Sequence, residues 1–88
     1  MGGRALLAWN LRRLRTARGV SQEKLAVDAG VARSWVSRIE RQSANTSIDL
    51  VERLAAALEV PMGEFLVAPP EGAYPPEPLR SGRKSGGR

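Results

Sequence analysis

The chain has 88 residues, which is room for one small domain and little more. Its 14 Lys and Arg residues outnumber 9 Asp and Glu residues, so the net charge favours a polyanionic binding partner. Only Lys24 and Lys84 are lysines, and the many arginine guanidinium groups favour nucleic acid as that partner. The sequence has no Cys and no His, which removes disulfides, thiolate chemistry, the commonest zinc ligands and the usual general base. We therefore expect no metal, no cofactor and no enzymatic activity.

Apolar residues are too scattered along the chain to span a bilayer, and no secretory apolar stretch follows the first residues. We expect a cytoplasmic, nucleoid-associated protein of bacterial type, with no membrane partner.

The first predicted element is an amphipathic helix over residues 4–18. Leu7, Leu11 and Leu14 recur in it at three- and four-residue spacing. Gly19 follows at a position that suits the left-handed residue of a helix end. This segment therefore predicts one helix with a single apolar face.

Two short helices are expected next. Ser21 is placed as the N-cap of a helix over residues 21–29, and Gly30 is suited to end it. Only residues 30–32 separate it from a third helix over residues 33–41. So short a connection predicts two helices that cross at a sharp angle.

The rest of the fold is expected after the polar residues 42–45. Thr46 or Ser47 is suited to cap a fourth helix that reaches Val60, and Pro61 suits the first position of a short fifth helix through Leu66. From residue 68 onward come five of the six prolines and few large apolar residues, which predicts a disordered, basic tail. The expected architecture is all-α: a compact five-helix domain over residues 4–67, then the tail over residues 68–88.

The second and third expected helices carry small and apolar residues at offsets that suit a close crossing. Ala26 is small where the helices approach each other, and Gly30 makes the turn between them. The residues expected to bury the inner faces are Leu25, Val31, Val36 and Ile39. The outer face of the third helix keeps Arg33, Ser34, Ser37 and Arg38, with Trp35 beside them. A polar helix face of this kind is what entry into a DNA major groove requires.

These segments together resemble the helix-turn-helix regulators of the lambda-repressor and Cro type, also called the xenobiotic-response-element family. The resemblance extends over about residues 5–67 and is carried by the segments at 10–15, 18–26, 29–34, 37–41 and 54–61. A narrower similarity, over residues 33–45, is to the controller proteins of restriction-modification systems, small dimers that regulate transcription. The resemblance implies double-stranded DNA as the partner.

The resemblance also implies roles for individual residues. Gln22 corresponds to a phosphate anchor at the start of the second helix, and Ser43 and Asn45 are expected to contact the backbone. Bases are expected to be read by Arg33, Ser34, Ser37 and Arg38, because an arginine can bind guanine O6 and N7 together. Trp35 would either touch thymine methyls or sugars or cover the second helix, and we favour DNA contact.

Arg15 and Glu40 correspond to a family pair that forms a partly buried salt bridge between the first and third helices. We expect this pair to be structural, with only an indirect effect on DNA binding.

Three positions depart from the family pattern. Ala32 stands where Ser or Thr is usual, so the third helix loses an N-cap side chain. Gln42 replaces a customary glycine, and Ala44 occupies a position that is commonly basic. We therefore expect a modest affinity for DNA.

A homodimer on a palindromic operator is expected, with Met62, Phe65 and Leu66 at the interface. The alternative for these residues is that they only complete the core. A second alternative for the chain is an antitoxin-type module that binds a partner protein. The tail segment at 81–88 could track phosphates or have no role.

Overall fold

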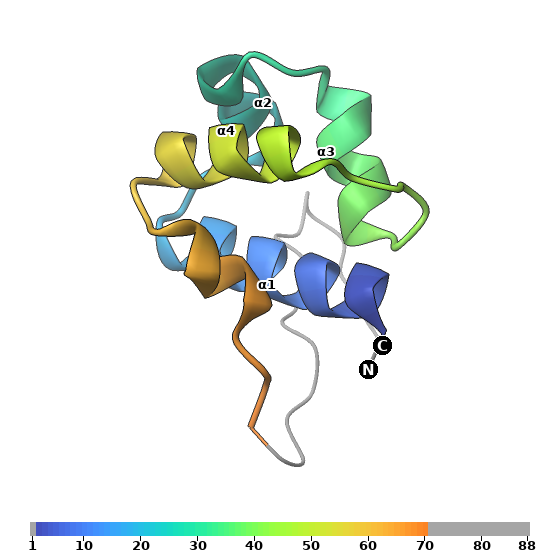
Figure 1. Cartoon of the computed structure of the whole chain (residues 1–88). Coiled ribbons are helices and arrows are strands. Elements are labelled where there is room, and N and C mark those ends of the chain that lie inside the picture. The colour runs from blue at the N-terminus through green and yellow to red at the C-terminus, as the bar shows by residue number, and fades with distance from the viewer. Residues whose placement is uncertain (1, 71–88) are drawn as a thin grey trace, which may run out of the picture.

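The computed structural model describes residues 2–70, and every regular element in this range is helical (Figure 1). In chain order, these elements are α1 (Gly3–Ala17), α2 (Gln22–Ala29), α3 (Arg33–Glu40), α4 (Ile48–Leu58) and the 3-10 helix η1 (Met62–Leu66). The all-α class expected from the sequence is confirmed.

The ends of α2 follow from local chemistry. The Ser21 hydroxyl accepts a hydrogen bond from the backbone N–H of Lys24, as an N-cap should. Gly30 ends the helix in the left-handed conformation at φ 73°, which glycine adopts without steric cost. α3 therefore begins only three residues after α2 ends, as the sequence predicts.

The N-terminus of α4 has the same chemistry. Of the two candidate caps, Ser47 fills the role, because its hydroxyl accepts a hydrogen bond from the N–H of Leu50. The helix ends at Leu58, two residues before the expected end, and Glu59 takes the left-handed conformation at φ 59°.

The short fifth helix differs from the prediction in type. η1 is a 3-10 helix, and Pro61 is its extended N-cap residue and not its first helical residue. Residues 2–70 therefore form four α-helices followed by a short 3-10 helix.

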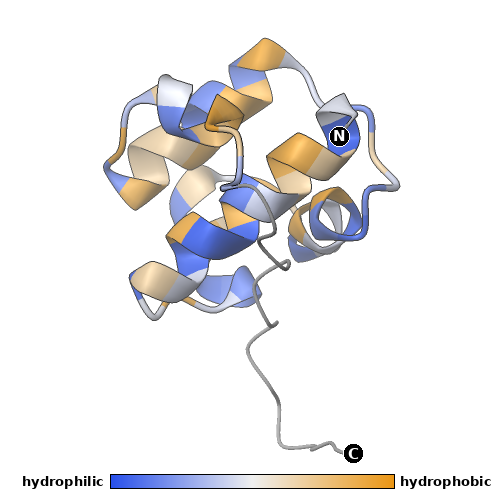
Figure 2. Cartoon of the chain, turned by 90° about the horizontal axis from the view of Figure 1, so that it is seen from below, coloured by the Kyte–Doolittle hydropathy of each residue, from blue (hydrophilic) through white to orange (hydrophobic). Residues whose placement is uncertain are grey.

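One core joins all five elements. α3 packs against both α1 and α2, while α4 packs against α2 and η1 (Figure 1). The ribbons in Figure 2 carry hydrophobic and hydrophilic stretches on the same helices, which is the pattern of amphipathic helices around a single core. The fully buried members include Leu11, Leu25, Val36, Ile39, Leu54, Leu58 and Phe65.

A buried polar contact attaches η1 to α1. The side-chain amide of Asn10 is fully buried and donates hydrogen bonds to the carbonyl oxygens of Phe65 and Val67, each at 2.9 Å. Its oxygen accepts bonds from Arg13, which in turn donates to the carbonyl oxygen of Glu64. Asn10 therefore joins the backbone that follows Glu64 to α1 through a buried bond to Phe65 and a part-buried bond to Val67.

No helix between residues 2 and 70 is both long and apolar enough to cross a membrane. Beyond Pro70, the predicted tail lies outside the described residues, including the basic segment at 81–88.

Candidate nucleic-acid interface

The two faces of α3 differ sharply in burial. Val36 and Ile39 are buried against the rest of the domain, while Arg33, Ser34 and Arg38 are exposed and Ser37 is half-buried. The predicted base-reading residues are thus accessible together on one short helix. Because the inner face is fixed by packing, the outer face is presented on a rigid element.

α3 begins without a capping side chain. Ala32 holds the extended conformation of an N-cap residue but offers no side-chain acceptor to the first N–H groups of the helix. The sequence prediction that this cap is missing is confirmed. Such N–H groups carry the partial positive charge of a helix N-terminus.

Trp35 has a partly structural role. Its ring is half-buried and packs against the core cluster, and its indole nitrogen is buried without a hydrogen-bond partner. The guanidinium of Arg38 lies 4.8 Å from the ring centroid, a cation–π distance. Trp35 therefore contacts both the core and the Arg38 guanidinium.

The turn after α3 explains one departure from the family pattern. Gln42 takes the left-handed conformation at φ 63°, so it fills the backbone role of the customary glycine. Ser43 follows with its N–H and hydroxyl bonded to the carbonyl oxygen of Arg38. Ser43 and Asn45 are both exposed beside α3, whereas Ala44 between them is buried in the core. A basic residue at position 44 would not fit this core site.

Arg15 and Glu40 form the expected ion pair in the core. The Nε and Nη2 atoms of Arg15 lie 2.6 and 2.9 Å from the two oxygens of Glu40, and both side chains are at most 2% exposed. The remaining nitrogen of the guanidinium donates to the carbonyl oxygen of Val20. The pair is therefore more deeply buried than the sequence prediction of a partly buried bridge.

Two further donors reach the same carboxylate. Gln22 Nε2 lies 3.2 Å and Arg12 Nε 3.3 Å from Glu40 Oε1. Burial by itself raises the pKa of the Glu40 carboxyl, but the hydrogen bond and charge of Arg15, with the bonds from Gln22 and Arg12, outweigh burial and lower the pKa below its ordinary value of 4.5. Glu40 is therefore an anion that joins α1, α2 and α3.

The three residues predicted at the dimer interface differ in their exposure to solvent. Phe65 is completely buried in the core, so the prediction that it faces a second subunit is wrong. The reason is that η1 folds back over α1 and α4, which turns this aromatic ring inward. Leu66 is 66% exposed, and Met62 is half-buried.

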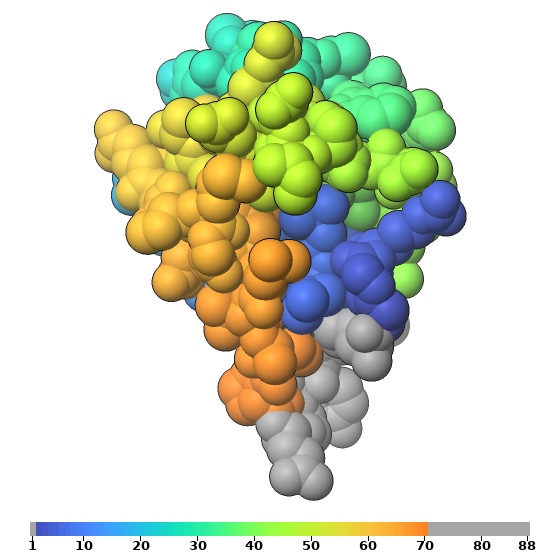
Figure 3. All heavy atoms as spheres, in the orientation of Figure 1, coloured from blue at the N-terminus to red at the C-terminus, as the bar shows by residue number. Residues whose placement is uncertain are grey.

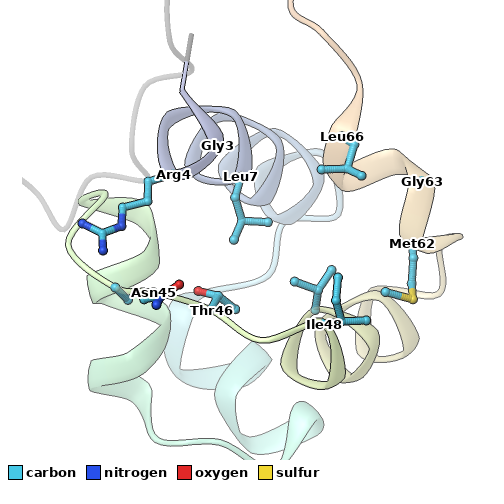
Figure 4. Close-up of a pocket in the computed structure, with 11 residues that line it drawn as sticks. Gly3, Arg4, Leu7, Asn45, Thr46, Ile48, Met62, Gly63 and Leu66 are labelled. Atoms are coloured by element: carbon cyan, nitrogen blue, oxygen red, sulfur yellow. The ribbon is translucent and has the colours of Figure 1, made fainter.

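A hollow lies beside these residues, where residues of η1, the start of α1 and residues 44–51 meet (Figures 3 and 4). Its volume is about 500 Å³ and its lining is mostly apolar. Ile48, which sequence reasoning did not select, is 71% exposed at this hollow. The lining residues named in Figure 4 are Gly3, Arg4, Leu7, Asn45, Thr46, Ile48, Met62, Gly63 and Leu66.

Comparison with known proteins also identifies a helix-turn-helix domain. The model of a family described as "Helix-turn-helix domain" matches residues 6–65. A hypothetical transcription factor of Neisseria meningitidis is 43% identical over 68 residues, which are 77% of this chain and 64% of that relative. The control protein C.BamHI of Bacillus amyloliquefaciens is 36% identical over 72% of this chain and 79% of its own length.

Solved structures of similar proteins have a similar fold. The crystal structure of the Neisseria factor NHTF superposes with a TM-score of 0.76 at 41% identity, over 80% of each chain. The restriction-modification controller protein C.AhdI of Aeromonas hydrophila superposes with a TM-score of 0.69 at 40% identity, over 70% of this chain and 94% of its own. The chain spans less than two thirds of the length of some curated relatives, such as 38% of the Escherichia coli regulator SutR. With a matching family model over most of its length and close relatives among transcriptional regulators and controller proteins, this chain belongs to the helix-turn-helix family.

Proposed function

We propose that the chain is a cytoplasmic, nucleoid-associated transcriptional regulator that binds a palindromic DNA operator as a homodimer, with α3 in the major groove. The observation that carries this proposal is the exposed polar face of α3, on which Arg33, Ser34 and Arg38 are accessible together. A guanidinium can bind guanine bidentately in that groove, and hydroxyls can bond to several base edges. Ser37 and the edge of Trp35 complete the proposed reading surface.

Phosphate contacts are proposed for the residues around α3. Gln22 begins α2, where helix N–H groups and the dipole favour an anion, and its amide is held by Glu40. Ser43 and Asn45 are exposed on the turn that follows α3. Contacts on both sides of the helix would fix its register on the duplex without reading sequence.

The proposed dimer uses the apolar hollow and its rim. Ile48 and Leu66 are the exposed apolar side chains there, and Met62 lies with them in the lining (Figure 4). Exposed apolar groups that surround an apolar hollow favour burial against another surface. Two copies related by a twofold axis would present two α3 helices to half-sites about 34 Å apart.

The similarity to C.BamHI and C.AhdI supports a narrower proposal, that the regulated genes encode a restriction-modification system. These two relatives are named as a control protein and a restriction-modification controller protein.

Selection from randomised duplex DNA, followed by footprinting, tests the proposed function. We expect an enriched palindrome with half-sites one helical turn apart. Equal binding to all sequences would contradict it, because a surface that reads bases must discriminate among them.

The oligomeric state is tested separately by sedimentation of the full chain and the Leu66→Glu variant. We expect the unmodified chain to be dimeric and Leu66→Glu to be monomeric, while Val27→Glu, a control at an exposed apolar residue of α2, stays dimeric. A monomeric unmodified chain that instead copurifies with a second protein would favour the antitoxin-type alternative.

A further inference from the structure

Glu40 is a shared acceptor for side chains of two other helices. Its Oε1 atom accepts hydrogen bonds from Gln22 of α2, from Arg12 of α1 and from Arg15 of α1. Gln22 Nε2 and Arg12 Nε therefore both lie within 3.3 Å of one oxygen atom. The bond to a carboxylate also fixes which end of the amide points inward, because only the nitrogen end can donate.

The two arginines of this cluster differ in accessibility. The side chain of Arg15 is 2% exposed, and its three guanidinium nitrogens are bonded to Glu40 and to the carbonyl oxygen of Val20. The side chain of Arg12 is 21% exposed, and its bonds to Glu40 are longer, at 3.3 Å to the carboxylate and 3.4 Å to the backbone oxygen. Arg12 is therefore the cation of the cluster that reaches solvent.

The charges of this cluster favour a phosphate near Gln22. Arg15 already balances the Glu40 carboxylate that holds the Gln22 amide, so the second guanidinium, that of Arg12, leaves the cluster with a net positive charge. A guanidinium can serve a carboxylate and a phosphate through different N–H groups.

We propose that Arg12 is a DNA-backbone contact that binds the same phosphate as Gln22, and that Glu40 positions both side chains. This inference rests on the proposed function, since it names a further contact of the same DNA-binding surface. It gives α1 a direct part in binding.

Salt dependence of DNA binding tests the role of Arg12. The observed affinity is measured against salt concentration on a short duplex that the unmodified chain selects from randomised DNA. We expect Arg12→Gln to make the log–log slope shallower by about 0.9 for each protomer bound, as loss of one phosphate contact does. The control is Arg53→Gln, which removes the same charge from an exposed position on α4 and should leave the slope within error of the unmodified chain. Equal slopes for the two variants would overturn the proposal.

The shared phosphate is tested by combining Arg12→Gln with Gln22→Ala. If both side chains hold one phosphate, the double variant should lose less affinity than the product of the two single fold-changes. Strict multiplicativity would show that they bind different groups and would overturn the proposal.

Folding of each variant is checked by circular dichroism and thermal melting. Should Arg12→Gln fail to fold, replacement of Arg12 by citrulline, a neutral side chain of the same shape, gives the same slope comparison. Absence of any DNA binding by the unmodified chain would overturn the proposed function itself. DNA binding with equal salt slopes for the two variants would overturn only the role of Arg12, so the two failures are distinguishable.

Discussion

Loss of Arg15 is expected to destabilise the domain strongly. In Arg15→Met, the chain keeps a side chain of similar length but Glu40 loses its two shortest hydrogen bonds, at 2.6 and 2.9 Å. Both side chains are nearly sealed from solvent, at 2% and 1% exposure, so water cannot replace the lost partner. The carbonyl oxygen of Val20 also loses its side-chain donor.

The expected cost follows from this burial. Removing one partner of a buried pair costs about 3–5 kcal/mol in the free energy of unfolding. For a domain of this size, each kcal/mol lowers the melting temperature by about 4–8 °C, so we expect a fall of more than about 10 °C. Arg12 and Gln22 still bond to the carboxylate, which places the cost towards the lower end of that range.

Urea unfolding monitored by circular dichroism measures this cost, with Arg18→Met as the control. Arg18 pairs with Glu59 across the surface, with side chains 42% and 75% exposed, so its loss should cost about 1 kcal/mol or less. If Arg15→Met cost no more than Arg18→Met, the idea that the buried pair holds α1 to α3 would have to be abandoned.

Three further predictions concern stability. Because folding lowers the pKa of Glu40, this carboxylate contributes to the free energy of unfolding at pH values above its ordinary pKa of 4.5, and the contribution is lost as pH falls through the lower pKa of the folded state. Urea titrations across acidic pH should show this loss, and Glu40→Gln should reduce the pH dependence. Ala32→Ser should add the missing cap of α3 and raise the free energy of unfolding by about 0.5–2 kcal/mol, and no change in thermal melting would contradict the capping argument. Asn10→Ala should cost about 1–3 kcal/mol in the free energy of unfolding, because the buried hydrogen bond to the carbonyl oxygen of Phe65 and the part-buried one to Val67 are both lost; thermal melting would detect this, and a neutral effect would show that other groups satisfy these oxygens.

The elements that the sequence predicts well are those that depend on neighbouring residues. Ser21 caps α2 and Gly30 ends it because the interactions involved lie within one helical turn. The apolar spacing of Val36 and Ile39 likewise sets which face of α3 is buried. These local signals are sufficient to place the helix-turn-helix unit.

Features that depend on distant residues escaped prediction. The sequence places Phe65 at a subunit interface, with the core as the alternative, and only the way η1 folds back over α1 and α4 shows that it belongs to the core. The structural role of Asn10 cannot be predicted from its neighbours, since its partners lie 55 and 57 residues away in the chain. The sequence marks Ala44 only as a departure from a commonly basic position, and its burial in the core, after the left-handed turn at Gln42, is visible only in the structure.

Within the candidate site, the resemblance identified the pair of Arg15 and Glu40 but not the cluster around it. In the sequence, Arg12 is one of three arginines close together in the first predicted helix, with Arg13 and Arg15, and no pattern distinguishes it. Its place beside Gln22 depends on where the end of α3 meets α1, which only the assembled fold shows.

The central claim is that the outer face of α3 reads DNA sequence. Its most direct test measures the affinities of the unmodified chain and of Arg33→Ala for a panel of operators, each with one base pair changed. The account predicts that Arg33→Ala loses about 1–3 kcal/mol on the intact operator and no longer discriminates at one base pair in each half-site. An Arg33→Ala variant that keeps the full discrimination of the unmodified chain at every position would contradict it.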